Sequence, residues 1–159
     1  MFESGLAITV AGVFIAVVLG GIGSAVGVST AGQAGAGVIS EKPELFGKVL
    51  VLQALPGTQG IYGFLAGLLV LIQVGLLGGE AATVSVSTAW QLFFACMPVG
   101  FTCLVSGIQQ GKATAAGLQA VAKDPSNVGK AIIMSAMVET YAVLGLLITI
   151  LLLFGIEIA

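Results

Sequence analysis

A single acidic residue stands in the middle of a long apolar stretch near the end of the chain. Glu139 lies in Ala-Met-Val-Glu-Thr-Tyr at positions 136–141, about ten residues into the last of four apolar stretches. In a membrane-spanning helix, ten residues rise about 15 Å and bring the carboxylate near the bilayer midplane. A charge there costs at least ~2.5–3.5 kcal/mol, and intramembrane acids usually mark ion or proton paths. No lysine lies at that depth, so a proton or a bound cation must neutralise Glu139.

The second apolar stretch offers polar groups at a similar depth. Leu55, Thr58, Gln59 and Tyr62 follow the spacing i, i+3, i+4, i+7, which places them on one face of a helix. Thr58 and Gln59 supply a hydroxyl and an amide oxygen, and Tyr62 supplies a phenolic donor. Pro56 lacks a backbone N–H and disturbs the preceding turn, which leaves carbonyl groups there less committed to the helix.

The third apolar stretch adds two neighbouring amides, Gln109 and Gln110. Oxygen ligands around one carboxylate favour a hard cation over a soft transition metal. A proton needs only the carboxyl group and a dry pocket, whereas Na⁺ needs several oxygens to replace its water shell. The residues therefore favour Na⁺ on Glu139, with H⁺ as the other cargo; hydrogen bonding between helices is a purely structural alternative for the amides and hydroxyls.

The composition is that of a protein coated by lipid. Of 159 residues, 58% are hydrophobic and 8% are charged, and the mean hydropathy is +1.16. Soluble domains carry about a quarter charged residues. The absence of arginine and histidine removes the usual phosphate clamps and imidazole bases. No phosphate loop surrounds Lys112, because Ser106 and Ala113 replace the glycine and the hydroxyl residue it needs. We expect no nucleic acid, nucleotide or cofactor, and no catalytic site on this chain.

Four apolar stretches exceed the ~20 residues needed to cross a bilayer. They cover residues 6–38, 47–77, 88–122 and 129–156. Backbone groups in lipid must be satisfied within the segment, so each stretch is predicted to be a helix. The predicted fold is an all-α membrane protein with four transmembrane helices in two tandem hairpins, residues 1–80 and 81–159. The first stretch is too long for a signal-peptide core, and we assign it to a retained span.

Charge placement predicts the orientation in the membrane. All five lysines lie in or near the first and third connections: Lys42, Lys48, Lys112, Lys123 and Lys130. The opposite side carries the acids Glu3, Glu80 and Glu157. By the positive-inside rule, loops 39–46 and 122–128 are cytoplasmic and both termini lie outside.

The two halves resemble each other when the numbering of the first is raised by 82, which we call the repeat offset. Pro43, Gly47, Lys48, Thr58 and Gly63 match residues of the same type in the second half: Pro125, Gly129, Lys130, Thr140 and Gly145. Both copies cross the membrane in the same direction, and a parallel repeat suits rotation about the membrane normal rather than alternating access. The position that matches Glu139 is Gly57, so one carboxylate serves four helices. A rotor with one ion for every two hairpins would carry fewer ions in each turn, so each ion could be driven against a larger gradient. This ratio would favour ion pumping over ATP synthesis.

Small residues recur every four positions in the first and third stretches. Helix 1 has Gly23, Gly27, Ala31 and Gly35, and helix 3 has Cys103, Gly107, Gly111 and Ala115. Upstream of the connections the repeat register slips, and Gly23 and Gly27 match Gly107 and Gly111. Small residues at this spacing let helices approach closely in lipid, either within one chain or in a curved wall of many copies. Cys96 and Cys103 lie about 10 Å apart along a helix, too far for a disulfide, and are interpreted as packing residues.

Three motifs are similar to those of the rotor-ring proteolipid (subunit K, or c-type subunit) of bacterial V-type ATPases, the vacuolar or archaeal type. They are Leu-Pro-Gly-Thr-Gln-Gly-Ile-Tyr-Gly at 55–63, Ser-Gly-Ile-Gln-Gln-Gly-Lys at 106–112 and Met-Val-Glu-Thr-Tyr-Ala at 137–142. The resemblance covers nearly the whole chain. It implies a Na⁺ site with these ligands: Glu139, Gln110, Thr58, Gln59 and the backbone carbonyl of Leu55. Tyr62 matches a tyrosine that hydrogen-bonds the glutamate and locks the site, whereas Gln109 stands where the family often has a small residue.

The resemblance also implies an assembly in the cell membrane. Identical copies would form a ring in contact with lipid, with helices 1 and 3 inside and helices 2 and 4 outside. A membrane stator subunit would present an arginine opposite Glu139, and central stalk subunits would dock on the cytoplasmic loops. The rotor would carry Na⁺, or H⁺ in relatives with similar motifs, as the ring turns against the stator.

Two other functions remain open at this level. A small four-helix proton-coupled exporter of cations would need an aromatic pocket for cation–π contacts, but the chain has one tryptophan, Trp90, near a membrane edge. In a structural or pore-forming proteolipid, Glu139 would be incidental, and its replacement by glutamine would leave ATP-driven transport intact.

Overall fold

Long parallel and antiparallel helices make up the described part of the chain. The structure is a computed structural model that describes residues 4–78 and 83–158. Its α-helices are α1 (Ser4–Glu41), α2 (Phe46–Ala54), α3 (Thr58–Gln73), α4 (Val86–Lys123) and α5 (Val128–Phe154). Because α2 and α3 continue one another, four helical segments are long and apolar enough to cross a membrane. The predicted all-helical fold with four spans is confirmed, while Glu3, Glu80 and the predicted boundary at residues 80 and 81 lie outside the described residues.

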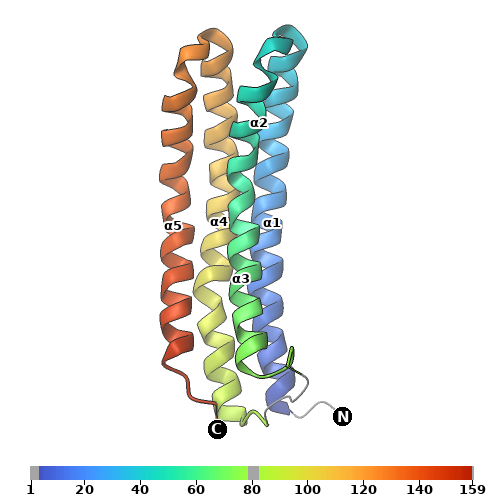
Figure 1. Cartoon of the computed structure of the whole chain (residues 1–159), viewed down its shortest axis with the longest axis vertical. Helices are drawn as coiled ribbons and strands as arrows, with labels where there is room; N and C mark the ends of the chain where they lie inside the picture. Colours follow the sequence, from blue (N-terminus) through green and yellow to red (C-terminus); the bar gives the residue numbers. More distant parts are fainter. Residues whose placement is uncertain (1–3, 79–82, 159) are drawn as a thin grey trace.

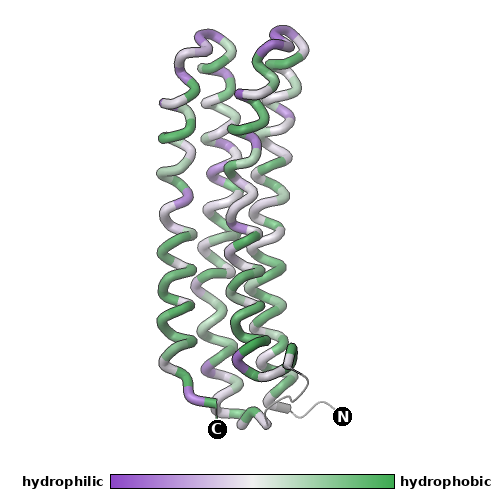
Figure 2. The backbone as a smooth tube through the Cα atoms, in the orientation of Figure 1, coloured by the Kyte–Doolittle hydropathy of each residue, from purple (hydrophilic) through white to green (hydrophobic). Residues whose placement is uncertain are grey.

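The connections at one end of the bundle are built alike (Figure 1). Short 3₁₀ helices, η1 (Pro43–Leu45) and η3 (Pro125–Asn127), join α1 to α2 and α4 to α5. The start of α1 and the end of α5 lie at the opposite end. Hydrophobic positions dominate the length of the bundle, and hydrophilic positions gather at the end that carries η1 and η3 (Figure 2).

The second span is broken where the sequence places Pro56. A 3₁₀ turn, η2 (Leu55–Gly57), separates α2 from α3. Proline cannot donate the hydrogen bond that a continuous helix needs at this position. The predicted disturbance at Pro56 is therefore confirmed, and α2 and α3 together form the second span.

The second span also ends earlier than predicted. Gly75 has a φ of 71° and its amide bonds to the carbonyl of Ile72 at 3.0 Å, while the amide of Leu76 bonds to the carbonyl of Leu71 at 3.1 Å. This pair of bonds is a Schellman cap, which favours glycine because only glycine adopts a positive φ without steric cost. Residues 74–77 are as apolar as the helix before them, so their hydrophobicity did not indicate that the helix ends at Gln73.

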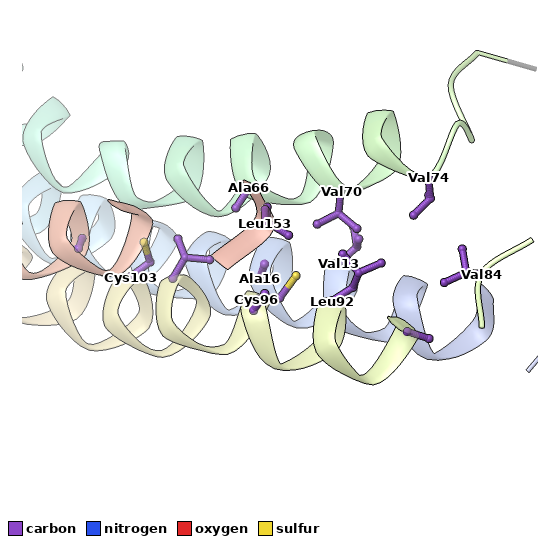
Figure 3. Packing of buried hydrophobic residues seen from close by; sticks show 14 residues of the cluster. Val13, Ala16, Ala66, Val70, Val74, Val84, Leu92, Cys96, Cys103 and Leu153 are labelled. Carbon is purple, nitrogen blue, oxygen red and sulfur yellow. The ribbon is translucent and has the colours of Figure 1, made fainter. Parts of the chain in front are cut away.

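Helices α1 and α4 share the largest interface in the bundle. A Cβ atom on Gly27 would overlap the carbonyl oxygen of Gly107, and one on Gly111 would overlap the Cα atom of Gly27. The predicted close approach of small residues therefore occurs within one chain. Cys96 and Cys103 are fully buried free thiols in the apolar core beside α1, as their interpretation as packing residues required (Figure 3).

A pair of equivalent hydrogen bonds fixes the register of the internal repeat. The hydroxyl of Ser24 donates to the carbonyl of Pro56 at 2.8 Å, and the hydroxyl of Ser106 donates to that of Val138 at 2.9 Å. Both members of the second pair follow those of the first by the repeat offset. The bonds Thr58 to Leu55 and Thr140 to Met137 repeat in the same way, as do η1 and η3.

This register corrects one match drawn from the sequence. A Cβ atom on Gly107 would lie 2.6 Å from the carbonyl carbon of Gly23, so the two residues face each other across the α1–α4 interface. Equivalent residues of two copies related by a small rotation must face the same way. Gly23 therefore corresponds to Val105, not to Gly107, and the repeat offset holds along the whole of α1 and α4.

Candidate functional site: a carboxylate bonded across three helices

Glu139 on α5 receives hydrogen bonds from two other helices. The hydroxyl of Tyr62 on α3 donates to Glu139 Oε1 at 2.6 Å, and Nε2 of Gln110 on α4 donates to Glu139 Oε2 at 3.2 Å. Glu139 is half-buried, whereas Gln110 is completely buried. Each carboxylate oxygen thus has one donor, and the shorter bond has the length of a charge-assisted one.

Two buried amides link this carboxylate to α3. Nε2 of Gln59 donates to Oε1 of Gln110 in a short contact, and also to the hydroxyl of Ser106 at 3.1 Å. Gln59 is completely buried as well. Every buried side-chain nitrogen and oxygen in residues 4–78 and 83–158 has a hydrogen-bond partner. The polar groups therefore form one satisfied network in an apolar bundle, which fixes the positions of the amides.

Thr58 and Leu55 lie at the edge of this network. The hydroxyl of Thr58 donates to the carbonyl of Leu55 at 3.1 Å and approaches Oε1 of Gln59 at 3.4 Å. The carbonyl of Leu55 is available because it belongs to the 3₁₀ turn at Pro56. The structure thus groups the predicted residues around Glu139, but it connects Thr58 and Leu55 to the carboxylate through Gln59 and Gln110 rather than directly.

Ser106 is a site residue that the sequence reading missed. Its hydroxyl accepts from Gln59 and donates to the backbone carbonyl of Val138, directly before Glu139. It thereby holds α3, α4 and α5 together at the depth of the carboxylate. The available signal was its position one helical turn before Gln110, on the same face.

Two other residues that the sequence singled out, Gln109 and Gly57, take no part in the site. Gln109 is exposed on the outer side of α4 and takes no part in the network around Glu139. Gly57, which matches Glu139 in the first half, lies beside Val28: a Cβ atom there would be 3.7 Å from the Val28 methyl group. Val28 in turn matches Gln110, so the first hairpin has glycine and valine where the second has the acid and the amide.

One side of Glu139 opens towards the outer surface of α5. A shallow groove there is lined by one polar and several apolar residues in addition to the acid: Ala136, Thr140, Val143 and Leu144. Within the described residues no group of three histidine, cysteine or acidic side chains could hold a metal ion. A hard ion bound at Glu139 would have to use the neutral oxygens around it.

The lysine-rich end of the bundle is held by hydrogen bonds to backbone carbonyls. Lys42 Nζ donates to the carbonyl of Ala122 at 2.5 Å, and Lys48 Nζ donates to that of Pro125 at 3.1 Å. Both bonds join the first hairpin to the second. At the third connection, the backbone N–H of Ser126 bonds to the Asp124 carboxylate at 2.9 Å and lowers its pKa from the usual value.

Comparisons with known proteins identify the family of the chain. The family model of the ATP synthase C subunit matches residues 11–70 and again residues 93–152, so the second match begins and ends where the repeat offset places the ends of the first. The chain is 45% identical to the V-type sodium ATPase subunit K of Enterococcus hirae over 153 residues, which are 96% of this chain and 94% of that protein. It is 46% identical to the A-type ATP synthase subunit K of Methanocaldococcus jannaschii over 145 residues, 91% of this chain and 61% of that longer protein. The chain therefore belongs to the family of ATP synthase C subunits, in a two-hairpin form like the subunit K proteins.

Proposed function

We propose that this chain is the membrane rotor subunit of a rotary ATPase and that it carries Na⁺ on Glu139. The observation that carries the proposal is the carboxylate bonded to Tyr62 and Gln110 within a membrane bundle. The name of the Enterococcus relative, a sodium ATPase subunit, supports the choice of ion. Family membership favours this function over a small cation exporter or a structural proteolipid.

The ion would be held by oxygen atoms from three helices. Glu139 provides the charge, and the neutral oxygens come from four residues around it: Gln110, Thr58, Gln59 and the carbonyl of Leu55. Such a set suits a hard cation, which prefers carboxylate, carbonyl and hydroxyl oxygens. Tyr62 bonds the carboxylate from the side and keeps it turned towards the other ligands.

Ion binding requires the amide of Gln110 to change its partner. Its nitrogen now donates to Glu139, while its oxygen accepts from Gln59. When Na⁺ approaches the carboxylate, the amides of Gln110 and Gln59 turn together about their last side-chain torsions. The Gln110 oxygen then faces the ion, and the Gln110 nitrogen donates to the Gln59 oxygen, which reverses the present bond between the two amides. These torsions are soft, so the exchange needs no change in the helices.

Rotation would bring Glu139 past a stator in the membrane. The groove beside Glu139 on the outer face of α5 gives the stator access to the carboxylate. An arginine on the stator would pair with Glu139 after the ion has left, because this chain has no arginine of its own. Identical copies form the ring, with α1 and α4 inside and the second and fourth spans outside.

The lysines would face the cytoplasm. Loops 39–46 and 122–128 then carry the central stalk, and both termini lie outside. The bonds of Lys42 and Lys48 to the second hairpin stiffen this end, which suits a surface that transmits torque. The two hairpins, residues 1–80 and 81–159, would move as one body with one ion.

Carbodiimide labelling of native membranes tests the proposal, because the reagent attacks protonated carboxyl groups in apolar surroundings. We expect Glu139 to be labelled and millimolar Na⁺ to protect it, and Glu139→Gln to abolish the labelling. Labelling without protection by Na⁺, but with loss at low proton concentration, would make the cargo H⁺. If Glu139 is not labelled at all, or if Glu139→Gln leaves ATP-driven transport intact, the rotor function is refuted.

A further inference from the structure

An exposed face of α4 is covered by no other helix in the described part of the chain. Phe94 and Phe101 are 62% and 55% exposed, Val105 is 58% exposed, and Gln109 lies in the same row. A groove runs along this face between α4 and α5, lined by Phe101, Thr102, Val105, Ser106, Gln109, Val138 and Tyr141. Gln109 has no role in the ion site, so this face needs an explanation of its own.

The internal repeat identifies what should cover this face. The repeat offset is fixed by the equivalent bonds of Ser24 and Ser106, and the two family matches have the same offset. The residues that line the groove correspond in the first hairpin to Leu19, Gly20, Gly23, Ser24, Gly27, Pro56 and Gln59. All of these except Leu19 are buried.

Helix α4 covers several of these first-hairpin residues directly. A Cβ atom on Gly23 would meet Cys103 and Leu104, and one on Gly27 would meet Gly107. Gln59 donates hydrogen bonds into α4 as well. The groove on the second hairpin is thus the equivalent of a surface that a neighbouring helix fills in the first hairpin.

The complementary surface lies on α1. The face of α4 that packs on α1 contains Phe93, Cys96, Cys103, Gly107 and Gly111, of which all but the half-buried Phe93 are buried. Their equivalents in the first hairpin are all exposed: Ala11, Phe14, Gly21, Ala25 and Ser29. One hairpin therefore exposes the surface that the other buries, on both sides of the chain.

We propose that the exposed face of α4 packs on the exposed face of α1 of the next copy, with Gln109 against Ser29 of that copy. The proposal rests on the rotor function, which requires copies in a ring, and it assigns the residues at their boundary. Within the chain, Gly27 touches Gly111 and Gly23 touches Gly107. Continued by the same operation, these contacts become Gln109 with Ser29, and Val105 with Ala25, across the boundary.

The chemistry of the two residues fits this placement. An amide and a hydroxyl can bond to each other between helices in lipid, where polar groups need partners. Ser29 already accepts a bond from Gln33 of its own helix at 3.2 Å, so its hydroxyl has a hydrogen left to donate to the Gln109 oxygen. Because Gln109 and Ser29 replace two glycines, the contact between copies is wider than the contact between hairpins.

The lysine-rich end extends the same boundary. Lys48 bonds to the carbonyl of Pro125 across the two hairpins. Its equivalent, Lys130, is exposed and bonds only locally, to Asn127 at 3.1 Å. In the ring, Lys130 reaches the carbonyl of Pro43 of the next copy, since Pro43 is the equivalent of Pro125.

Cysteine cross-linking in native membranes tests the boundary. Gln109→Cys combined with Ser29→Cys, oxidised with copper phenanthroline, should give a ladder of dimers and higher species. Val105→Cys with Ala25→Cys is a second pair and should give the same ladder, so the test survives if one variant does not assemble. Disulfides form where Cα atoms lie within ~7 Å, which the two faces of a single chain do not offer because they point away from each other.

The control pairs the same cysteine on α1 with a lipid-facing residue. Ile133 on α5 is 64% exposed, and its equivalent, Val51, is 53% exposed, so this position is uncovered in both hairpins. Ser29→Cys with Ile133→Cys, and each single variant, should give no ladder. A ladder from the control pair, or none from either test pair in assembled rings, would overturn the proposed boundary and leave the rotor function standing. A wild-type chain that forms no high-mass assembly would overturn both.

Discussion

Replacing Tyr62 by phenylalanine removes one hydrogen bond from the ion site and leaves every proposed ligand in place. The bond from the Tyr62 hydroxyl to Glu139 is 2.6 Å long, which is typical of a charged acceptor. Hydrogen bonds to charged groups contribute ~1.5–3 kcal/mol. Because Tyr62 and Glu139 are both half-buried, we take the lower end of that range. Since about 1.4 kcal/mol is a factor of ten, Na⁺ should bind about tenfold more weakly.

The assay is the Na⁺ concentration that gives half-protection of Glu139 from carbodiimide labelling. Tyr62→Phe should raise that concentration about tenfold, because the lost donor favours the ionised carboxylate that holds Na⁺ over the protonated one that reacts. The amount of Na⁺ bound at saturation should not change, since the phenol is not a ligand.

Tyr141 provides a matched control elsewhere on the bundle, in the groove between α4 and α5. Its side chain is 66% exposed and lies two residues after Glu139 in sequence, so Tyr141→Phe removes the same hydroxyl without touching the bond to the carboxylate. Equal half-protection in the wild type and Tyr62→Phe, with intact rings, would refute the idea that this bond stabilises the ion-bound carboxylate. A loss of affinity as large in Tyr141→Phe would do the same.

Three further changes probe the scaffold around the site. Gly111→Ala should lower the thermal stability by ~1–3 kcal/mol in detergent, because its Cβ atom would overlap the α1 backbone; Gly37→Ala, which meets nothing within 4 Å, should be neutral or stabilising by ~0.5–1 kcal/mol. Ser106→Ala should weaken Na⁺ protection severalfold because Gln59 loses an acceptor. Thr149→Ala, which removes a buried hydroxyl that joins α5 to α4 outside the ion site, should not, and equal effects would contradict the role of Ser106. The pKa of Asp124 is lowered from its usual value of 3.8, so its capping bond stabilises the third connection above pH 3.8, and this stabilisation is lost as the pH falls through the lowered pKa. Amide exchange at this connection should accelerate only in that acid range. Acceleration near neutral pH would refute the assignment.

The sequence carried the features that depend on long apolar runs and on isolated polar residues within them. Hydrophobicity and helix periodicity predict the four spans, the position of Glu139 and the shared face of Gln59 and Tyr62. A polar side chain within a membrane span is costly, so it indicates a partner or a function. The break at Pro56 was visible for the same reason: proline has one consistent effect on a helix.

Other features depend on contacts that local patterns do not encode. A serine within a helix bonds to its own backbone as readily as to a neighbour, so the only signal for Ser106 was its place one helical turn before Gln110. Glycines every four residues are compatible with several registers, which led to the match of Gly23 with Gly107. The bonds of Ser24 and Ser106 to the next span fix the offset for these two helices.

That offset gives the difference between the hairpins a quantitative consequence. Gly57 and Val28 occupy in the first hairpin the places of Glu139 and Gln110 in the second, and a Cβ atom on Gly57 would meet only Val28. A cation near Gly57 would have no charge to neutralise it, and the desolvation cost of a bare ion in an apolar bundle is prohibitive. We therefore expect purified rings to bind one radioactive Na⁺ per 15.9 kDa chain, and none after Glu139→Gln. Two ions per native chain would contradict the inference that the first hairpin binds no ion. Each ion would then serve one hairpin instead of two, so the ratio that favours pumping would be lost as well.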